Sequence, residues 1–153
     1  MVYTARVLWN RRPDEAFVDS KYSRAHTWAF DGGTEVPGSA SPHVVPLPLS
    51  VEAAVDPEEA FVASISSCHM LWFLSLAAEQ GFVVESYEDN AEGVLGKNAD
   101  GRVAMLRVIL KPRIEYGARA TPSAAQIAAL HHQAHERCFI ANSVTTEISV
   151  VQS

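Results

Sequence analysis

The chain lacks any cluster of lysine and arginine residues. It carries 12 basic residues against 18 acidic residues, which gives a formal net charge of −6 over 153 residues. Proteins that bind nucleic acid or anionic lipid neutralise phosphate charges with basic patches. The sequence offers no such patch, so we expect neither nucleic acid nor a membrane surface as a partner.

Cysteine is also scarce, with Cys68 and Cys138 the only two. The first residues, "MVYTARVLWNRR", lack the apolar core and the small-residue cleavage site of a signal peptide. We therefore predict a cytoplasmic protein. In that compartment a disulfide is more often catalytic or redox-sensing than structural. The spacing of the two cysteines leaves open whether they are partners.

Charge is absent from residues 60–78, a run of 19 residues that approaches the length of a membrane-spanning helix. Four serines, a cysteine and a histidine interrupt the run. Acidic residues flank it, and no basic residue lies close enough to orient a membrane span. We expect a helix surrounded by protein rather than by lipid.

The hydrophobic content of 48% and the length favour one compact domain over residues 1–153. Apolar alternation predicts an amino-terminal antiparallel meander, with "DGG" as a turn, and the proline-rich residues 35–49 allow at most a short edge strand. The predicted strands are residues 2–10, 22–30, 82–88, 93–97, 102–114 and 143–151.

Two helices have start signals. Asp56 as N-cap and Pro57 at the first helical position begin one that Gly81 ends. Thr121 and Pro122 repeat this signal for a second helix toward Arg137. The order of strands and helices predicts an α+β fold.

Cys68 lies ten residues after Glu58 on the first helix, about 15 Å along its axis. The two side chains therefore need a third group, such as a long basic residue, to connect them. A free cysteine is most often a small buried hydrophobe, and this alternative stays open. His69 points about 100° away from Cys68 around the helix, which favours a core histidine over a base for the thiol.

A metal site is a further alternative on the second helix. His131 and His135 are four residues apart, and Cys138 follows three residues later, so a regular helix would place all three on one face. The pattern has low specificity, because it lacks the glutamate of metalloproteases and a second cysteine pair.

Three segments resemble the OsmC/Ohr family of osmotically inducible and organic hydroperoxide resistance proteins. "DPEEAFVASISSC" is similar to the family's helix with a reactive cysteine, and "AHERCFIANSV" to the segment with its second cysteine. "YSRAHTWAFDGG" resembles its arginine segment. Phe139, Ile140 and Ala141 replace the family's Pro-Tyr-Ser, and the residues around Cys68 also differ, which indicates a branch divergent from the best-known peroxidases.

The resemblance implies an OsmC-like fold, with antiparallel sheets around two helices, in an intertwined homodimer. It implies a cofactor-free peroxidase that reduces organic hydroperoxides in oxidative stress defence. Cys68 would attack the peroxide and form a sulfenic acid, Cys138 would resolve it as a disulfide, and an external dithiol would reduce that bond. Arg24 would stabilise the Cys68 thiolate, and Glu58 would hold Arg24. The alternative is a redox sensor or small-molecule binding protein of the same fold.

Overall fold

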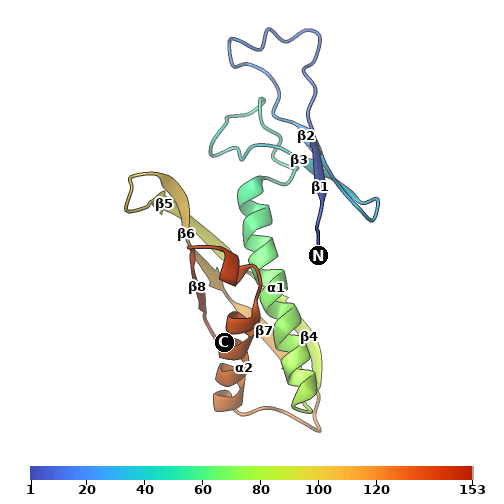
Figure 1. The fold of residues 1–153 in the computed structure, drawn as a ribbon, viewed down its shortest axis with the longest axis vertical. Coiled ribbons are helices and arrows are strands. Elements are labelled where there is room, and N and C mark those ends of the chain that lie inside the picture. The colour runs from blue at the N-terminus through green and yellow to red at the C-terminus, as the bar shows by residue number, and fades with distance from the viewer. Residues whose placement is uncertain (153) are drawn as a thin grey trace. The chain divides into compact units, whose positions relative to one another are not determined.

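The computed structural model describes residues 1–152 and divides the chain into two compact units. The first unit is Met1–Ala60 and the second is Phe61–Ser153. Figure 1 shows the order of their elements along the chain. The assignment of residues 1–153 to one domain stays a prediction.

The first unit contains a three-stranded antiparallel sheet in the order β1-β2-β3. Its strands are β1 (Ala5–Leu8), β2 (His26–Phe30) and β3 (Glu35–Gly38). The predicted meander is confirmed, and the proline-rich segment provides only the short edge strand β3. The predicted strand over 22–30 is shorter than expected, because β2 begins at His26 and Arg24 lies in the preceding loop.

Helix α1 (Pro57–Glu79) begins and ends where the sequence predicts. Asp56 Oδ1 accepts a hydrogen bond of 2.8 Å from the Glu59 amide, and Glu59 Oε2 accepts one of 3.2 Å from the Asp56 amide. This reciprocal pair satisfies two amides at the helix start. Gly81 ends the helix with a φ of +79°, a conformation that glycine adopts without strain.

One described helix, α1, is long and apolar enough to cross a membrane by length and composition, and 28% of its most apolar window is buried. The buried positions recur at helical spacing and form one face against the rest of the second unit. They are Ile65, His69, Phe73, Leu76 and Ala77.

The second unit has two sheets. β4 (Val84–Asp89) pairs with β7 (Pro112–Tyr116), and β5 (Glu92–Lys97), β6 (Val103–Leu110) and β8 (Glu147–Val150) form the other. The prediction of one strand over 102–114 is wrong: the chain changes sheets at Lys111, whose amide donates to Asp89 Oδ1 at 2.6 Å instead of joining a ladder. β8 runs parallel to β6, so the sheets are mixed rather than purely antiparallel.

Helix α2 (Ala124–Arg137) packs beside the carboxyl-terminal half of α1 (Figure 1), where Phe73, Leu76 and Ala77 meet Leu130 and Ala134. Its N-cap is Ser123 rather than the predicted Thr121. Ser123 and Gln126 form a capping box. Thr121 cannot form one, because the residue three positions later is Ala124 and not a glutamate or glutamine. After α2, the 3₁₀ helix η1 (Ala141–Ser143) occupies the start of the predicted last strand.

Candidate functional site

The two cysteines are neighbours in the second unit, and both are free thiols. Cys68 lies on α1 and is half-buried, whereas Cys138 is the C-cap of α2 and is 1% exposed. Burial, followed by a hydrogen bond between its side chain and Cys68, raises the pKa of Cys138 to about 11. The sequence spacing alone did not establish this proximity.

The pair is chemically asymmetric. Cys138 keeps its proton at neutral pH because of its raised pKa, so its S–H group donates to the Cys68 sulfur. Cys68 is the more accessible of the two sulfurs, and the buried Cys138 sulfur is its neighbour, which is the arrangement that disulfide formation after oxidation of Cys68 requires.

Arg24, in the first unit, uses only one of its terminal nitrogens within the described residues. Its Nη1 donates to the carbonyl oxygens of Tyr22 at 2.5 Å and Ser20 at 2.8 Å. The guanidinium lies 3.7 Å from the centre of the Tyr22 ring, in a cation–π contact. No carboxylate of residues 1–152 forms an ion pair with it.

Glu58 lies in the first turn of α1, also in the first unit. Its Oε2 atom is buried and has no hydrogen-bond partner among the described residues. The expected hydrogen bond between Arg24 and Glu58 is therefore not formed in this single chain. Among the described residues, Arg24 Nη2 and Glu58 Oε2 have no hydrogen-bond partner. The catalytic roles of the two residues stay predictions.

A buried histidine pair joins the two helices of the second unit: His69, which follows Cys68 on α1, and His131 on α2. His69 Nε2 is 2.9 Å from His131 Nδ1, and the rings stack with centroids 5.3 Å apart. The pKa of each histidine is lowered to about 4, chiefly by burial, and the charges of His131 and His135 contribute to the shift of His69. Both rings are neutral at pH 7, so one nitrogen donates and the other accepts.

The sequence gives no signal for this pair, because its members are 62 residues apart on two helices. His69 Nδ1 is buried without a partner. A lone pair costs less to bury unpaired than an N–H group, so we assign the proton of His69 to Nε2, which then donates to His131 Nδ1. The prediction that His69 is a core histidine agrees with this burial.

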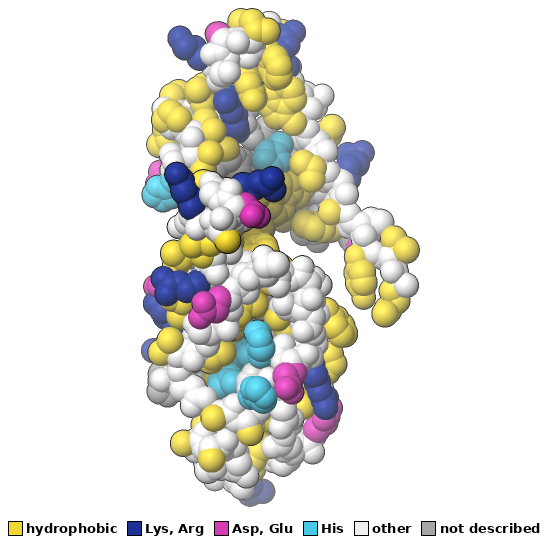
Figure 2. All heavy atoms as spheres, turned by 60° about the vertical axis from the view of Figure 1, so that its left-hand side comes forward, with side chains coloured by type: hydrophobic (Ala, Val, Ile, Leu, Met, Phe, Trp, Pro, Cys, Tyr) yellow, Lys and Arg dark blue, Asp and Glu magenta, His cyan; other side chains and the backbone are white. Residues whose placement is uncertain are grey.

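The alternative metal site at His131, His135 and Cys138 is wrong. Within residues 1–152, no three histidine, cysteine or acidic side chains come together as metal ligands. The helix ends at Arg137, so Cys138 leaves the helical spacing on which the prediction depended. His131 is bound to His69, and His135 is exposed. Figure 2 shows histidine side chains grouped beside acidic and basic ones on this unit's surface.

The apolar residues around Cys68 serve the core. Phe73 and Trp72 belong to the cluster between α1 and α2, and Phe61 packs against the second cluster, which Ile65, Val108 and Leu110 form. Trp72 also contacts Phe139 edge to face, with ring centroids 5.6 Å apart.

Comparisons with known proteins agree with this fold. The family model described as OsmC-like protein matches residues 50–153. An OsmC-like protein of unknown function from Vibrio cholerae shares 56% sequence identity, with a TM-score of 0.98 over 100% of this chain and 99% of that one. No curated protein sequence matches the chain.

Two organic hydroperoxide resistance proteins share the fold at lower identity. The protein OhrB of Bacillus subtilis is 19% identical, with a TM-score of 0.68 over 99% of this chain and 98% of that one. The protein from Elizabethkingia anophelis, solved with thiocyanate bound, is 16% identical, with a TM-score of 0.69 over 100% and 99% of the two chains.

Proposed function

The chain belongs to the OsmC-like protein family, and from this premise we propose that it is a cytoplasmic, thiol-dependent peroxidase that reduces organic hydroperoxides. The observation that carries the proposal is the hydrogen-bonded pair of free thiols, one half-buried and one buried. Relatives named as organic hydroperoxide resistance proteins support the substrate class.

The proposed reaction has three steps. The Cys68 thiolate attacks the distal oxygen of the hydroperoxide, the O–O bond breaks, and the alkoxide takes a proton and leaves as an alcohol. Cys68 is then a sulfenic acid. Cys138 loses its proton, attacks the Cys68 sulfur and releases water, which leaves a Cys68–Cys138 disulfide. An external dithiol supplies two electrons and two protons to restore both thiols.

Arg24 and Glu58 have supporting roles in this proposal. The positive charge of Arg24 stabilises the thiolate of Cys68, and the Glu58 carboxylate orients the guanidinium. Two observations support these roles: Arg24 has an uncommitted edge, and Glu58 Oε2 is buried without a partner.

The proposed active form is a homodimer. Helix α1 has no charged side chain from residue 60 to residue 78, whereas the exposed face of a helix in water usually carries several. The side chains that α1 leaves exposed in the single chain include Leu71, at 61% exposure, and several small residues. They fit close packing against a second copy. Sedimentation at twice the chain mass is the expected result.

The test is steady-state consumption of cumene hydroperoxide with dihydrolipoamide or dithiothreitol as reductant. Cys68→Ser is expected to lower the rate by roughly a thousandfold or more, because it removes the nucleophile. Cys138→Ser is expected to block disulfide formation, while the matched control Ser143→Ala leaves turnover intact. A protein that is oxidised once but does not turn over would instead support the redox sensor.

A further inference from the structure

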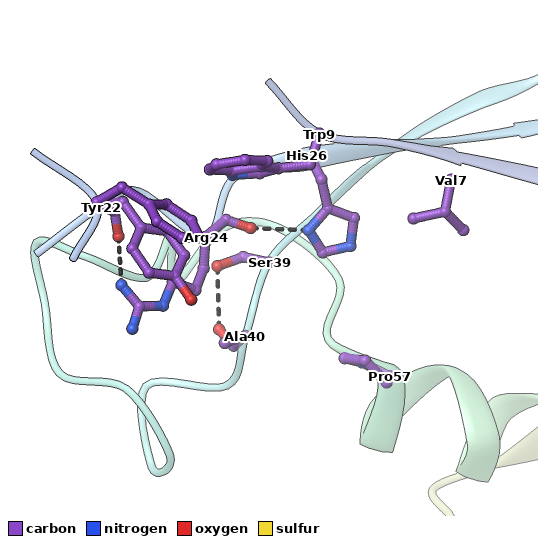
Figure 3. A pocket seen from close by; sticks show the side chains of 9 residues that line it. Val7, Trp9, Tyr22, Arg24, His26, Ser39, Ala40 and Pro57 are labelled. Atoms are coloured by element: carbon purple, nitrogen blue, oxygen red, sulfur yellow. Dashed lines mark hydrogen bonds between the residues drawn. The ribbon is translucent and has the colours of Figure 1, made fainter. Parts of the chain in front are cut away.

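The loop between β1 and β2 forms one wall of an open pocket on the surface of the first unit, which we call the aromatic pocket (Figure 3). Its volume is about 480 Å³, within the usual range for small-molecule sites. Three aromatic rings, one arginine and one histidine contribute to its lining. The residues concerned are Trp9, Phe17, Tyr22, Arg24 and His26, and the remaining lining is small or apolar.

The three aromatic rings contact one another. Phe17 and Tyr22 are stacked, with centroids 4.7 Å apart and planes inclined by 26°. Trp9 meets Tyr22 edge to face at 5.5 Å and lies 5.8 Å from Phe17. Phe17 and the Arg24 guanidinium both lie against the ring of Tyr22, so the faces left for a further planar ring are those of Trp9 and Phe17. The pocket therefore suits an aromatic ligand better than a flexible aliphatic one.

The loop that carries these rings is fixed although it has no regular secondary structure. The Trp9 indole donates to the Ser23 carbonyl at 2.8 Å, and Glu15 accepts from the amides of Ser23 at 2.9 Å and Arg12 at 3.2 Å. Phe17 has a φ of +66°, in the left-handed region that bulky residues avoid. An ordered loop that holds an aromatic residue in this conformation is preorganised for binding.

Most polar atoms of the pocket are already satisfied. His26 Nδ1 lies 2.7 Å from the Arg24 carbonyl, and its Nε2 accepts from the Trp28 indole at 2.8 Å. These partners fix His26 as the neutral Nδ1–H tautomer, because a proton on Nε2 would face the indole N–H. Ser39 Oγ donates to Ala40 and accepts from Val51. Neither side chain adds a charge.

Arg24 is thus the one charged group in the lining, and no carboxylate lines the pocket with it. Its Nη1 is occupied by two carbonyl oxygens, and among the described residues its Nε and Nη2 have no hydrogen-bond partner. This free edge of a guanidinium matches the two oxygens of a carboxylate. Figure 3 shows Arg24 beside Tyr22 and Ser39 at the pocket.

We propose that the aromatic pocket binds a small planar aromatic carboxylate, with its ring against Trp9 and Phe17 and its carboxylate on the free edge of Arg24. No cysteine lines the pocket, so binding can be measured in protein that lacks the peroxidatic thiol, although Arg24 belongs to both proposals. A consequence that does rest on the proposed function is competition: the bound carboxylate occupies the arginine and slows peroxide reduction.

The test is calorimetric titration of the full chain carrying Cys68→Ser with 2-naphthoate, 2-naphthamide and decanoate. We expect 2-naphthoate to bind at least about tenfold more tightly than the uncharged amide, because a hydrogen bond to a charged group contributes about 1.5 to 3 kcal/mol. We expect the aliphatic decanoate to bind more weakly than 2-naphthoate, since it cannot stack.

Two variants assign the binding to the pocket. Arg24→Lys keeps the positive charge but loses the planar guanidinium. It is expected to lower the affinity for 2-naphthoate by about tenfold and to leave the affinity for 2-naphthamide unchanged. Phe17→Leu is expected to weaken both ring ligands by about three- to tenfold. The matched control, Phe139→Leu, changes an exposed aromatic residue of the second unit and leaves binding unchanged.

Equal affinities for 2-naphthoate and 2-naphthamide in the unsubstituted pocket would overturn the proposal, and so would the absence of binding at millimolar concentration. Both comparisons use the pocket as it exists, so they decide the question even if the Arg24 variant fails to fold. If 2-naphthoate binds but does not inhibit peroxide reduction in the wild type, the binding proposal stands. The proposed catalytic role of Arg24 is then contradicted.

Discussion

The second unit buries apolar side chains, whereas the first unit buries small polar ones. Every buried hydrophobic residue among residues 1–152 lies beyond Ala60, and all of them except Cys138 and two prolines belong to the two clusters around α1. The buried residues of the first unit are Gly38, Ser39, Ser41, Ser50 and Asp56. The second unit is therefore stabilised by its own hydrophobic core, and the first unit relies on specific hydrogen bonds and on whatever covers its exposed apolar surface.

The difference separates two kinds of site. The cysteine pair and the histidine pair are fixed by the packing of α1 against α2, so their geometry is as stable as the core. The aromatic pocket is fixed by a loop that a few side-chain hydrogen bonds hold in place. The two kinds of site should therefore respond differently to substitution: a change in the core should lower stability more than a change in the loop.

Phe73→Ala is expected to have the largest effect on stability. Phe73 is 0% exposed in the cluster between α1 and α2, and removal of such a ring costs about 3 to 5 kcal/mol. Amide hydrogen exchange should show faster opening of both helices. Phe30→Ala, at a residue of the first unit that is 41% exposed, is the control and should cost less than about 1 kcal/mol. Equal costs would contradict the comparison.

Acid is expected to destabilise the second unit through the histidine pair. Burial lowers the pKa of His69 and His131 from 6.5 to about 4, so the unfolded chain binds protons first as the pH falls. The stability of the neutral pair is fully present above pH 6.5 and is lost as the pH falls toward 4. We expect a loss of at least about 3 kcal/mol, because the fall of one such pKa from 6.5 to about 4 alone corresponds to about that free energy.

Urea unfolding followed by Trp72 fluorescence, in protein carrying Trp9→Phe and Trp28→Phe, measures this loss in the second unit alone. The double variant His69→Leu and His131→Leu should flatten the dependence between pH 6.5 and 4. His132→Gln, which changes an exposed histidine of α2, is the control and should leave it unchanged. A slope that survives the double variant would assign the acid sensitivity to other groups.

Gly38→Ala is expected to disturb the first unit by about 1 to 3 kcal/mol. A Cβ atom on Gly38 would lie 2.6 Å from His26 Nε2 and 2.8 Å from Trp28 Nε1. Those two atoms bond each other, so neither can move without loss of the hydrogen bond. Thermal unfolding measures the cost. Gly32→Ala is the matched control because no heavy atom lies within 4 Å of its added Cβ, and an equal effect there would refute the close approach.

Ser20→Gly is expected to have the smallest effect and to stabilise the loop of the first unit. Ser20 has a φ of +62°, which glycine adopts without strain. The gain should be about 0.5 to 1 kcal/mol, partly offset by the greater freedom of the unfolded glycine chain. Ser23→Gly, at a residue without this conformation, should not stabilise the protein. Chemical denaturation of the two variants makes the comparison.

Local signals in the sequence predict where helices and strands lie better than they predict which of them pair in the fold. The caps at Asp56 and Gly81 predict α1 because they act within one turn of the chain. The sheet change at Lys111 and the parallel β8 depend on contacts across the fold, which alternation cannot encode. The motif resemblance identifies Cys68 and Cys138, but the histidine pair and the ring contacts of Phe17 have no sequence signal, since distant residues form them.

The most direct test of the proposed reaction is a count of free thiols, with peptide mapping, after one equivalent of cumene hydroperoxide is added to the reduced protein. We expect the wild type to lose two thiols per peroxide and to form a Cys68–Cys138 disulfide. We expect the Cys138→Ser variant to stop at a sulfenic acid on Cys68. If both thiols of the wild type persist while free cysteine in a parallel sample is oxidised, the peroxidase account is wrong.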